Sequence, residues 1–302
     1  MSSNASSLTL PPSDAIITSV RAALAEDIGS GDLTAALVPE AQQARGTVIT
    51  REPAVLCGQD WADAVFAALE PAVRIDWHCR DGDMLTAGQK LCDLRGPARA
   101  ILTGERTALN FLQTLSAVAS TTRRYVDAVA GTRATILDTR KTIPGLRLAQ
   151  KYAVRVGGGS NHRIGLHDGI LIKENHIVAA GGITPAVQRA RARGATVLLE
   201  VEVETLEQAE EALRAGADRL LLDNFPTPLM REAVALRDRL APGTGLEASG
   251  GIDLQTIRSV AETGIDFISV GDLTKNIRAI DLSMRFSFSF SDMAAAGMRP
   301  AR

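Results

Sequence analysis

The second half of the chain alternates short apolar runs with amphipathic stretches. The apolar runs contain β-branched and aliphatic residues without polar alternation, as is typical of parallel strands covered on both faces. We interpret as strands Thr135–Leu137, Ile170–Ile172, Val197–Val201, Arg219–Leu222, Leu246–Ala248 and Phe267–Val270. Repeated strand–helix units predict a barrel or an open doubly wound sheet. Because the pattern contains six such strands, a complete eight-stranded barrel is not expected.

The stretches between these strands carry helix-start signals. Thr205 with Gln208 forms a capping-box pattern, and Asp253 is expected as an N-cap. Pro185 and Pro228 are expected in first turns, where the missing backbone N–H costs little. These signals support the alternation of strands and helices.

The first hundred residues follow a less regular pattern. The segments that we expect to be ordered are a helix at Asp14–Glu26, strands at Gly46–Arg51, Val73–Arg80 and Gln89–Arg95, and a helix at Trp61–Leu69. Near the end, Asp281–Phe290 alternates strictly, with Leu282, Met284, Phe286, Phe288 and Phe290 on one face. This is the pattern of a half-buried antiparallel strand, and we expect it to return to the first domain.

The fold prediction is therefore α/β, with an incomplete β/α barrel of about six to seven parallel strands. An α+β N-terminal domain, completed by the C-terminal strand, accompanies it. The expected divisions are a flexible tail at 1–12, the N-terminal-type domain at 13–117 with 278–302, and the barrel domain at 118–277.

Composition narrows the class of partners. The net charge of −2 provides no field that would hold nucleic acid or anionic lipid. No apolar run approaches the roughly 20 residues that a spanning helix needs, and residues 1–12 lack the order of a signal peptide. The three cysteines, Cys57, Cys79 and Cys92, show no CxxC spacing. We expect a cytoplasmic protein with neither nucleic-acid nor membrane partners.

Charge or glycine follows every predicted strand of the second half. In β/α barrels the active site lies at the carboxyl ends of the strands, so these residues converge on one rim. They are Asp138, Arg140 and Lys141; Lys173, Glu174 and Asn175; Glu200, Glu202 and Glu204; Asp223 and Asn224; Ser249, Gly250 and Gly251; and Gly271 and Asp272. Such a succession favours a functional rim over ordinary polar loops.

This rim is divided by the sign of its charges. Between Asp138 and Lys173 the basic residues are Arg140, Lys141, Arg147, Lys151, Arg155, Arg163 and Lys173, against the acids Asp138 and Asp168. The next two strand ends carry the acids Glu202 and Asp223. Arginine and lysine bind carboxylates and phosphates, and a carboxylate pair suits Mg²⁺. The division predicts a polyanionic phosphate substrate that carries magnesium. For Arg147, Lys151 and Arg155 we favour a solvated helix face, given their four-residue spacing.

Two glycine-containing turns are candidates for phosphate binding. Ser249-Gly250-Gly251 lies between a strand and a predicted helix, and Val270-Gly271-Asp272 follows the next strand. Glycines let backbone N–H groups approach phosphate oxygens closely, and barrels often hold a phosphate at this position. For Gly157–Ser160, a flexible loop that ends a helix is about as plausible as a binding site.

The chain also resembles the quinolinate phosphoribosyltransferase family. The matching strings are Glu26-Asp27-Ile28-Gly29 with Gly31-Asp32-Leu33-Thr34, Gly104–Phe111, Asp138–Gly145, Gly158–Arg163 with its Asn161-His162-Arg163, Leu171–His176, and Glu200–Val203. Their order and spacing match from about residue 20 to 290. One departure is Lys275-Asn276, where the family often has histidine.

The resemblance implies an activity and an assembly. The activity is transfer of phosphoribosyl from phosphoribosyl pyrophosphate to quinolinate with decarboxylation, which gives nicotinate mononucleotide, pyrophosphate and CO₂ in de novo NAD biosynthesis. The implied assembly is a homodimer in which Arg106 acts in the partner's site. An ordinary ion pair with Glu105 is the plainer interpretation of Arg106.

The resemblance also implies roles for individual residues. Arg106, Arg140, His162 and Arg163 would bind the two quinolinate carboxylates, with Thr139 beside them. Lys141 and Lys173 would face the substrates, and Glu202 and Asp223 would hold the ribose hydroxyls and Mg²⁺. Ser249, Gly250, Gly251 and Gly271 would surround the 5′-phosphate.

Three other functions are compatible with parts of the pattern. The first is a phosphoribosyltransferase that acts on another aromatic acid, such as nicotinate. The second is a Schiff-base aldolase that uses Lys173, because this lysine follows a predicted barrel strand. The third is a non-catalytic paralogue, which the complete set of charged site residues disfavours.

Overall fold

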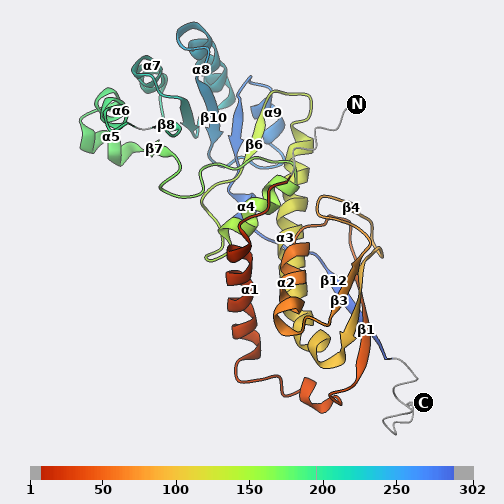
Figure 1. Ribbon diagram of the computed structural model, residues 1–302. Coiled ribbons are helices and arrows are strands. Elements are labelled where there is room, and N and C mark those ends of the chain that lie inside the picture. Colours follow the sequence, from red (N-terminus) through yellow and green to blue (C-terminus); the bar gives the residue numbers. More distant parts are fainter. Residues whose placement is uncertain (1–7, 195, 289–302) are drawn as a thin grey trace. The chain divides into compact units, whose positions relative to one another are not determined.

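The computed structural model describes residues 8–194 and 196–288. The chain forms two compact units, shown in Figure 1. The first comprises Met1–Ser120, Pro144–Gly157 and Ile277–Arg302, and the second comprises Thr121–Ile143 and Gly158–Asn276. This division differs from the predicted one in the segment 144–157, which groups with the first unit rather than with the barrel.

The first unit combines helices with a small antiparallel sheet. Its helices are α1 (Ser13–Ile28), η1 (Ala35–Leu37), α2 (Gln59–Leu69), the first part of α3 (Ala98–Ala128) and α4 (Arg147–Val156). The sheet has the order β12-β1-β5-β3, formed by β12 (Leu282–Phe288), β1 (Gln43–Thr50), β5 (Lys90–Pro97) and β3 (Arg74–Trp77). A separate pair joins β2 (Ala54–Val55) to β4 (Met84–Leu85).

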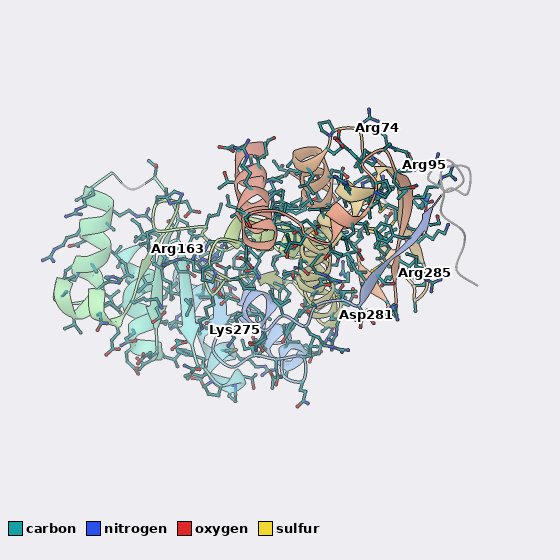
Figure 2. All side chains as sticks on the ribbon, turned by 90° about the horizontal axis from the view of Figure 1, so that it is seen from below. Arg74, Arg95, Arg163, Lys275, Asp281 and Arg285 are labelled. Carbon is teal, nitrogen blue, oxygen red and sulfur yellow. The ribbon has the colours of Figure 1, made fainter. Side chains whose placement is uncertain are left out.

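The terminal strand joins this sheet as predicted. β12 pairs antiparallel with β1, with Val48 opposite Met284 and Gly46 opposite Phe286. Phe290, expected on the same face, lies outside the described residues. The two faces of the sheet differ, because Val48 and Leu94 are buried while Arg74 and Arg95 are exposed and lie in directly opposite register positions. Figure 2 labels these two arginines and Arg285 on this sheet.

A close helix contact depends on Gly104 of α3. A Cβ at this position would lie 2.7 Å from Phe66 Cε1 and 2.9 Å from Leu69 Cδ1 of α2. The absence of a side chain therefore lets the two helices pack closely.

Gly104→Ala is expected to lower the free energy of unfolding by about 1–3 kcal/mol, because the added methyl group overpacks this contact. The usual preference of helices for alanine over glycine, about 1 kcal/mol, partly offsets the cost. Urea unfolding measures the change. Gly243→Ala is the matched control, since its Cβ meets nothing within 4 Å. Equal stability of the two variants would contradict the close contact.

The second unit is an open parallel barrel of six strands, which confirms the predicted incomplete β/α barrel. The sheet order is β6-β11-β10-β9-β8-β7. The strands are β6 (Thr135–Leu137), β7 (Ile170–Ile172), β8 (Leu199–Val203), β9 (Arg219–Asp223), β10 (Gly245–Ser249) and β11 (Phe267–Ser269). Its helices after β7 are α5 (Glu174–Ala180), α6 (Ile183–Ala192), α7 (Leu206–Ala215), α8 (Thr227–Leu240), α9 (Ile257–Ala261) and α10 (Asp272–Lys275).

One strand begins later than predicted. The sequence pattern placed it at Val197–Val201, whereas the ladder runs over Leu199–Val203. Leu198 is partly exposed and precedes the first paired residue, and the chain continues in register with β9 as far as Val203. The apolar residues Val197 and Leu198 therefore did not define the start of the ladder.

The sheet stays open between β6 and β7. Instead of pairing with β7, β6 forms a single parallel bridge to Ser160. In that bridge the Ser160 N–H donates to the Ile136 carbonyl at 2.8 Å, and the Asp138 N–H donates to the Ser160 carbonyl at 3.2 Å. The bridge brings the residues after Ser160 beside the carboxyl end of β6.

The predicted helix starts are largely confirmed. The Thr205 side chain accepts from the Gln208 N–H at 3.2 Å, while Gln208 Oε1 accepts from the Glu204 N–H at 2.8 Å. Pro185 and Pro228 lie in the first turns of α6 and α8. Asp253 caps the turn before α9, because its Oδ1 accepts two N–H groups while α9 begins at Ile257. None of the described helices is both long and apolar enough to cross a membrane.

Candidate active site

Most of the predicted site residues line one cavity at the carboxyl ends of the barrel strands. Its volume is about 260 Å³. The lining residues are Thr139, Arg140, Lys141, His162, Arg163, Leu171, Lys173, Glu202, Leu221, Asp223, Glu247, Ser249 and Ser269. They come from the ends of all six strands and from the loop before β7, so the expected convergence on one rim is confirmed.

The loop that carries His162 and Arg163 is fastened to the end of β6. Asp138 is fully buried and accepts two hydrogen bonds from this loop. Asn161 Nδ2 donates to its Oδ2 at 2.6 Å, and the His162 N–H donates to its Oδ1 at 2.9 Å. Hydrogen bonds to a buried carboxylate hold their donors firmly, so Asp138 sets the position of the loop.

Cations gather on one side of the cavity. Burial lowers the pKa of Arg163, and the neighbouring Arg140 guanidinium lowers it further. Arg163 Nη1 also donates to the Gly169 carbonyl at 3.1 Å, which directs the side chain; Figure 2 labels it in the second unit. Two arginines close enough to repel one another form a receptor for an anion with more than one charge.

Acids and a lysine line the part of the cavity formed by β7, β8 and β9. The Lys173 ammonium group forms an ion pair with the Glu202 carboxylate across β7 and β8. The Lys173 N–H donates to His176 Nδ1 at 3.0 Å. Asp223 ends β9 and lines the same cavity. Lysine and two carboxylates are thus available to a substrate that enters here.

Glycine is required at the turn after β10. Gly250 has a φ of +106°, and a Cβ there would lie 2.1 Å from Asn224 Oδ1. Gly251, with a φ of +58°, continues the turn. Residues with side chains adopt this conformation only at a cost. The Ser249–Gly251 turn therefore presents its backbone without side chains beyond Ser249.

Gly271, after β11, has a different environment. Its φ is −68°, so the backbone conformation does not demand glycine. A Cβ would contact Lys141 Cδ at 3.3 Å and Lys275 Cε at 3.8 Å. The two lysine side chains therefore pass close to the backbone at Gly271. Lys275, which occupies the position where the family often has histidine, also pairs with Asp272 at 3.3 Å.

The predicted solvated face of α4 is wrong. Lys151 is 2% exposed, and Arg155 is half-buried, with its guanidinium 6.0 Å from the Tyr152 ring centre. Its Nη2 donates to the Thr9 carbonyl at 2.5 Å. The four-residue spacing places Lys151 and Arg155 on one helix face, as predicted, but this face is largely buried and not solvated.

Arg106 is not among the residues that line this cavity. It lies on the part of α3 that belongs to the first unit, and its side chain is exposed. Its expected action in a partner's site stays a prediction.

Sequence reasoning missed Glu247, on β10 at the floor of the cavity. Burial, and next the charge of Glu200, raises the pKa of Glu247 to about 7. Burial likewise raises the pKa of Glu200. The available signal was a glutamate in the middle of an otherwise apolar strand, Leu246–Ala248, since buried carboxylates are rare without a partner.

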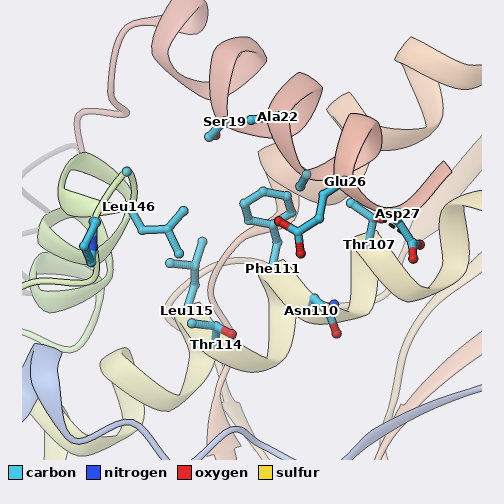
Figure 3. A pocket seen from close by; sticks show the side chains of 13 residues that line it. Ser19, Ala22, Glu26, Asp27, Thr107, Asn110, Phe111, Thr114, Leu115 and Leu146 are labelled. Carbon is cyan, nitrogen blue, oxygen red and sulfur yellow. Dashed lines mark hydrogen bonds between the residues drawn. The ribbon is translucent and has the colours of Figure 1, made fainter. Parts of the chain in front are cut away.

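A second cavity lies within the first unit and is shown in Figure 3. Its volume is about 360 Å³. Glu26 and Asp27 of α1, Asn110 and Phe111 of α3, and Pro144 contribute to its lining. Three strings that carried the family resemblance therefore meet here, although none of the residues given a site role lines it.

Comparison with known families agrees with this geometry. The family model described as quinolinate phosphoribosyl transferase, C-terminal domain, matches residues 118–285. The corresponding N-terminal domain matches residues 32–116.

Individual proteins are similar over nearly their whole length. The nicotinate-nucleotide pyrophosphorylase [carboxylating] of Mycobacterium leprae is 44% identical over 277 residues, which are 90% of this chain and 97% of that protein. A probable enzyme of the same name from Bacillus subtilis is 43% identical, over 87% of this chain and 91% of that protein. The nicotinate-nucleotide pyrophosphorylase structure from Francisella tularensis superposes with a TM-score of 0.88 at 45% identity, covering 93% of this chain and 99% of that one. With its two matched domains and these relatives, the chain belongs to the quinolinate phosphoribosyltransferase family.

Proposed function

We propose that this protein transfers phosphoribosyl from phosphoribosyl pyrophosphate to quinolinate and releases CO₂ and pyrophosphate, forming nicotinate mononucleotide. The observation that carries the proposal is one cavity with a cationic side on the segment between β6 and β7, which carries Arg140, Lys141 and Arg163, and an acidic side on β8 and β9, which carry Glu202 and Asp223. A dianionic acid fits the first side, and a ribose pyrophosphate fits the second with the glycine turns.

Quinolinate would lie against the arginines. Each guanidinium can bind a carboxylate through two parallel hydrogen bonds, and two arginines match two carboxylates. Thr139 and His162 line the same side. Both ring nitrogens of His162 already have protein neighbours, so the direct contact of His162 with a carboxylate stays a prediction.

Phosphoribosyl pyrophosphate would lie across the strand ends. The backbone of Ser249, Gly250 and Gly251 would face the 5′-phosphate, with Gly271 beside it, because glycines carry no side chain of their own that keeps phosphate oxygens from the backbone N–H groups. Lys141 passes close to Gly271 and would neutralise phosphate charge. Lys173 would leave Glu202 and meet the pyrophosphate.

Glu202 and Asp223 have the donor set that Mg²⁺ prefers, namely carboxylate oxygens at the edge of a cavity that admits phosphate. These two side chains would hold the ion, and Mg²⁺ would supply charge neutralisation to the pyrophosphate. Glu202 and Asp223 would also accept hydrogen bonds from the ribose hydroxyls.

The chain's own residues account for the chemistry as follows. The arginines hold the quinolinate nitrogen toward the anomeric carbon, which removes the entropic cost of orientation. Lys173 and Lys141 stabilise the negative charge on the departing pyrophosphate. Once the ring nitrogen carries the ribose it is cationic, and its positive charge stabilises the electron pair that stays on C2 as CO₂ leaves. A proton then adds to C2.

A second copy of the chain would complete the site. Arg106 is exposed on α3, and we propose that it adds a further cation to the quinolinate carboxylates of the partner in a homodimer. We also propose the cytoplasmic location that the sequence predicts. The three cysteines are free thiols, which is consistent with a reducing compartment.

The test is release of labelled CO₂ from carboxyl-labelled quinolinate, with each of phosphoribosyl pyrophosphate and magnesium omitted in turn. We expect release only when both are present. A protein that binds phosphoribosyl pyrophosphate but releases no CO₂ acts on another aromatic acid, such as nicotinate. Trapping with borohydride is expected to yield no adduct at Lys173, because the proposed transfer involves no Schiff base with a lysine.

Arg106→Ala mixed with Arg140→Ala tests the shared site. Each variant alone is expected to be inactive. In an equal mixture that exchanges subunits, about half of the dimers are mixed, and one of the two sites in each carries neither substitution, so the mixture is expected to regain up to about a quarter of normal activity. Arg99→Ala, on the same helix, serves as the control for Arg106→Ala. No recovery in a mixture shown to exchange subunits would contradict the contribution of Arg106 across the dimer.

A further inference from the structure

The roles proposed above leave two buried carboxylates unused. Glu200 of β8 is 1% exposed and Glu247 of β10 is fully buried. Because side chains alternate along a strand, Glu200 lies one layer beneath Glu202, and Glu247 one layer beneath Ser249. Barrel interiors at this depth usually contain branched aliphatic side chains. Burying a carboxylate costs several kcal/mol, so a structural filler does not explain the pair.

The imidazole ring of His162 lies against both carboxylates. Its Nε2 is 2.9 Å from Glu200 Oε2 and 3.6 Å from Glu247 Oε2. Within the described residues, neither Glu200 oxygen nor Glu247 Oε1 has an aligned hydrogen-bond donor, and His162 Nε2 is near Glu200 Oε2 without ideal alignment. Buried acceptors require a donor, and His162 Nε2 is the ring nitrogen within 4 Å of both carboxylates.

The other ring nitrogen fixes the tautomer. His162 Nδ1 accepts a hydrogen bond from the Arg163 N–H at 2.8 Å, so Nδ1 carries no proton. The proton of a neutral ring is then on Nε2. The three side chains also have the spacing of metal ligands, but a protonated Nε2 has no lone pair for a metal. A hydrogen-bonded ring is therefore the better description of this cluster.

Arg219 and Phe267 hold the carboxylates from beneath. Arg219 Nη1 is 3.2 Å from Glu247 Oε2, and the Arg219 guanidinium lies 3.9 Å from the centre of the Phe267 ring. Gly245 leaves room for this stack, since a Cβ there would lie 3.0 Å from Phe267 Cε2. The Arg219 guanidinium, which contacts Glu247, is thus packed against the Phe267 ring.

We infer that Glu200 and Glu247 are positioning residues: they hold the His162 ring, and through its Nδ1 the backbone of Arg163, so that the Arg163 guanidinium faces the acid substrate. The chain of contacts runs from Arg219 through Glu247 and Glu200 to His162 and then to the Arg163 N–H. This inference rests on the proposed function for the identity of the acid, and on the contacts alone for the arrangement of the ring.

The test compares Glu200→Met, which removes the acceptor at similar volume, with Glu200→Gln, which keeps one acceptor oxygen. We expect Glu200→Met to raise KM for quinolinate roughly 10–100-fold, the range seen when supporting partners of histidine ligands are removed. KM for phosphoribosyl pyrophosphate should change less than about threefold, since Arg163 does not face that substrate. Glu200→Gln should recover most of the quinolinate affinity.

Nitrogen-15 NMR of labelled histidine gives a readout that does not depend on catalysis. The chain has four histidines, and His162→Gln assigns the signal. We expect a protonated Nε2 and an unprotonated Nδ1 in the unsubstituted protein and in Glu200→Gln, and loss of this preference in Glu200→Met. Glu232→Gln, which removes an exposed carboxyl group on α8, is the control and should change neither KM nor the spectrum.

Different failures are distinguishable. If the unsubstituted protein shows the Nε2–H tautomer but releases no CO₂ from quinolinate, the proposed function fails while the arrangement of the ring stands. If Glu200→Met keeps the tautomer, or raises both KM values equally, the positioning role is wrong. If Glu200→Met does not fold, Glu200→Gln provides the test. A change in the His162 tautomer of that variant without a change in KM for quinolinate would also overturn the inference, because the ring would then not control substrate binding.

Discussion

Lys173→Met is expected to lower kcat/KM by about 10²–10³-fold, the loss typical of removing one group that stabilises developing negative charge. Lys173 directly follows β7 and forms an ion pair with Glu202 of the neighbouring strand β8. Its ammonium group is therefore within the site where pyrophosphate charge would develop. Methionine keeps much of the side-chain volume and removes only the charge.

Steady-state kinetics with both substrates varied will measure this effect. Most of the loss should appear in kcat, because the charge on the leaving group is larger in the transition state than in the bound substrate. Lys90→Met is the control, since Lys90 lies on β5 of the first unit with an exposed side chain. A loss in Lys173→Met below about fivefold, with the fold intact, would remove Lys173 from the proposed set of catalytic groups.

The second large effect is on stability and concerns Glu247. Its pKa is raised to about 7, first by burial and then by the charge of Glu200, while His162, Arg219 and Ser269 partly oppose the shift. In the unfolded chain a glutamate ionises near pH 4.3. Between these two values the folded protein binds a proton that the unfolded chain has lost, so stability falls as the pH rises.

The size of this loss follows from linkage. One pKa unit corresponds to about 1.4 kcal/mol, so Glu247 alone accounts for a decrease of roughly 2–3 kcal/mol in the free energy of unfolding between pH 4.5 and 7.5. Glu200, whose pKa is also raised, acts in the same direction. Glu247→Gln should flatten the dependence and make the variant more stable than the unsubstituted protein at pH 8.

Urea unfolding at pH 5, 6.5 and 8, followed by circular dichroism, measures the difference between the two proteins. Comparing differences cancels the contribution of all other titrating groups. Glu204→Gln provides a control in which an exposed carboxyl group is removed. Parallel pH profiles for Glu247→Gln and the unsubstituted protein would show that Glu247 ionises normally in the fold.

Much of the barrel follows from local patterns. Parallel strands covered on both faces need continuous apolar runs, and Thr135–Leu137 and Ile170–Ile172 coincide with the observed strands. The rim of the site follows from the same runs, because the residue after each parallel strand is brought to one edge by the topology. For this reason Lys173, Glu202 and Asp223 could be placed together from sequence.

Other features depend on contacts between distant segments. The burial of Lys151 on α4 is set by what packs over that helix, which a four-residue spacing does not encode. The sequence pattern predicted an incomplete barrel but not the bridge from β6 to Ser160 at its open edge. The sequence shows Glu247 only as a glutamate in an apolar strand, and it does not show that His162 contacts both Glu247 and Glu200. Individual residue roles and the shared dimer site stay predictions.

The open edge between β6 and β7 has a consequence for how the barrel assembles. From β7 to β11, each strand pairs with the next one in the chain, so each new pairing closes only a short loop. The pairing of β6 with β11 joins Thr135 to Phe267 and must close a loop of more than a hundred residues. Loops of that length close slowly. The residues that follow β6, which form the cationic side of the cavity, are therefore expected to join the acidic side in the last step of folding. A partly folded barrel would then have no complete substrate-binding site.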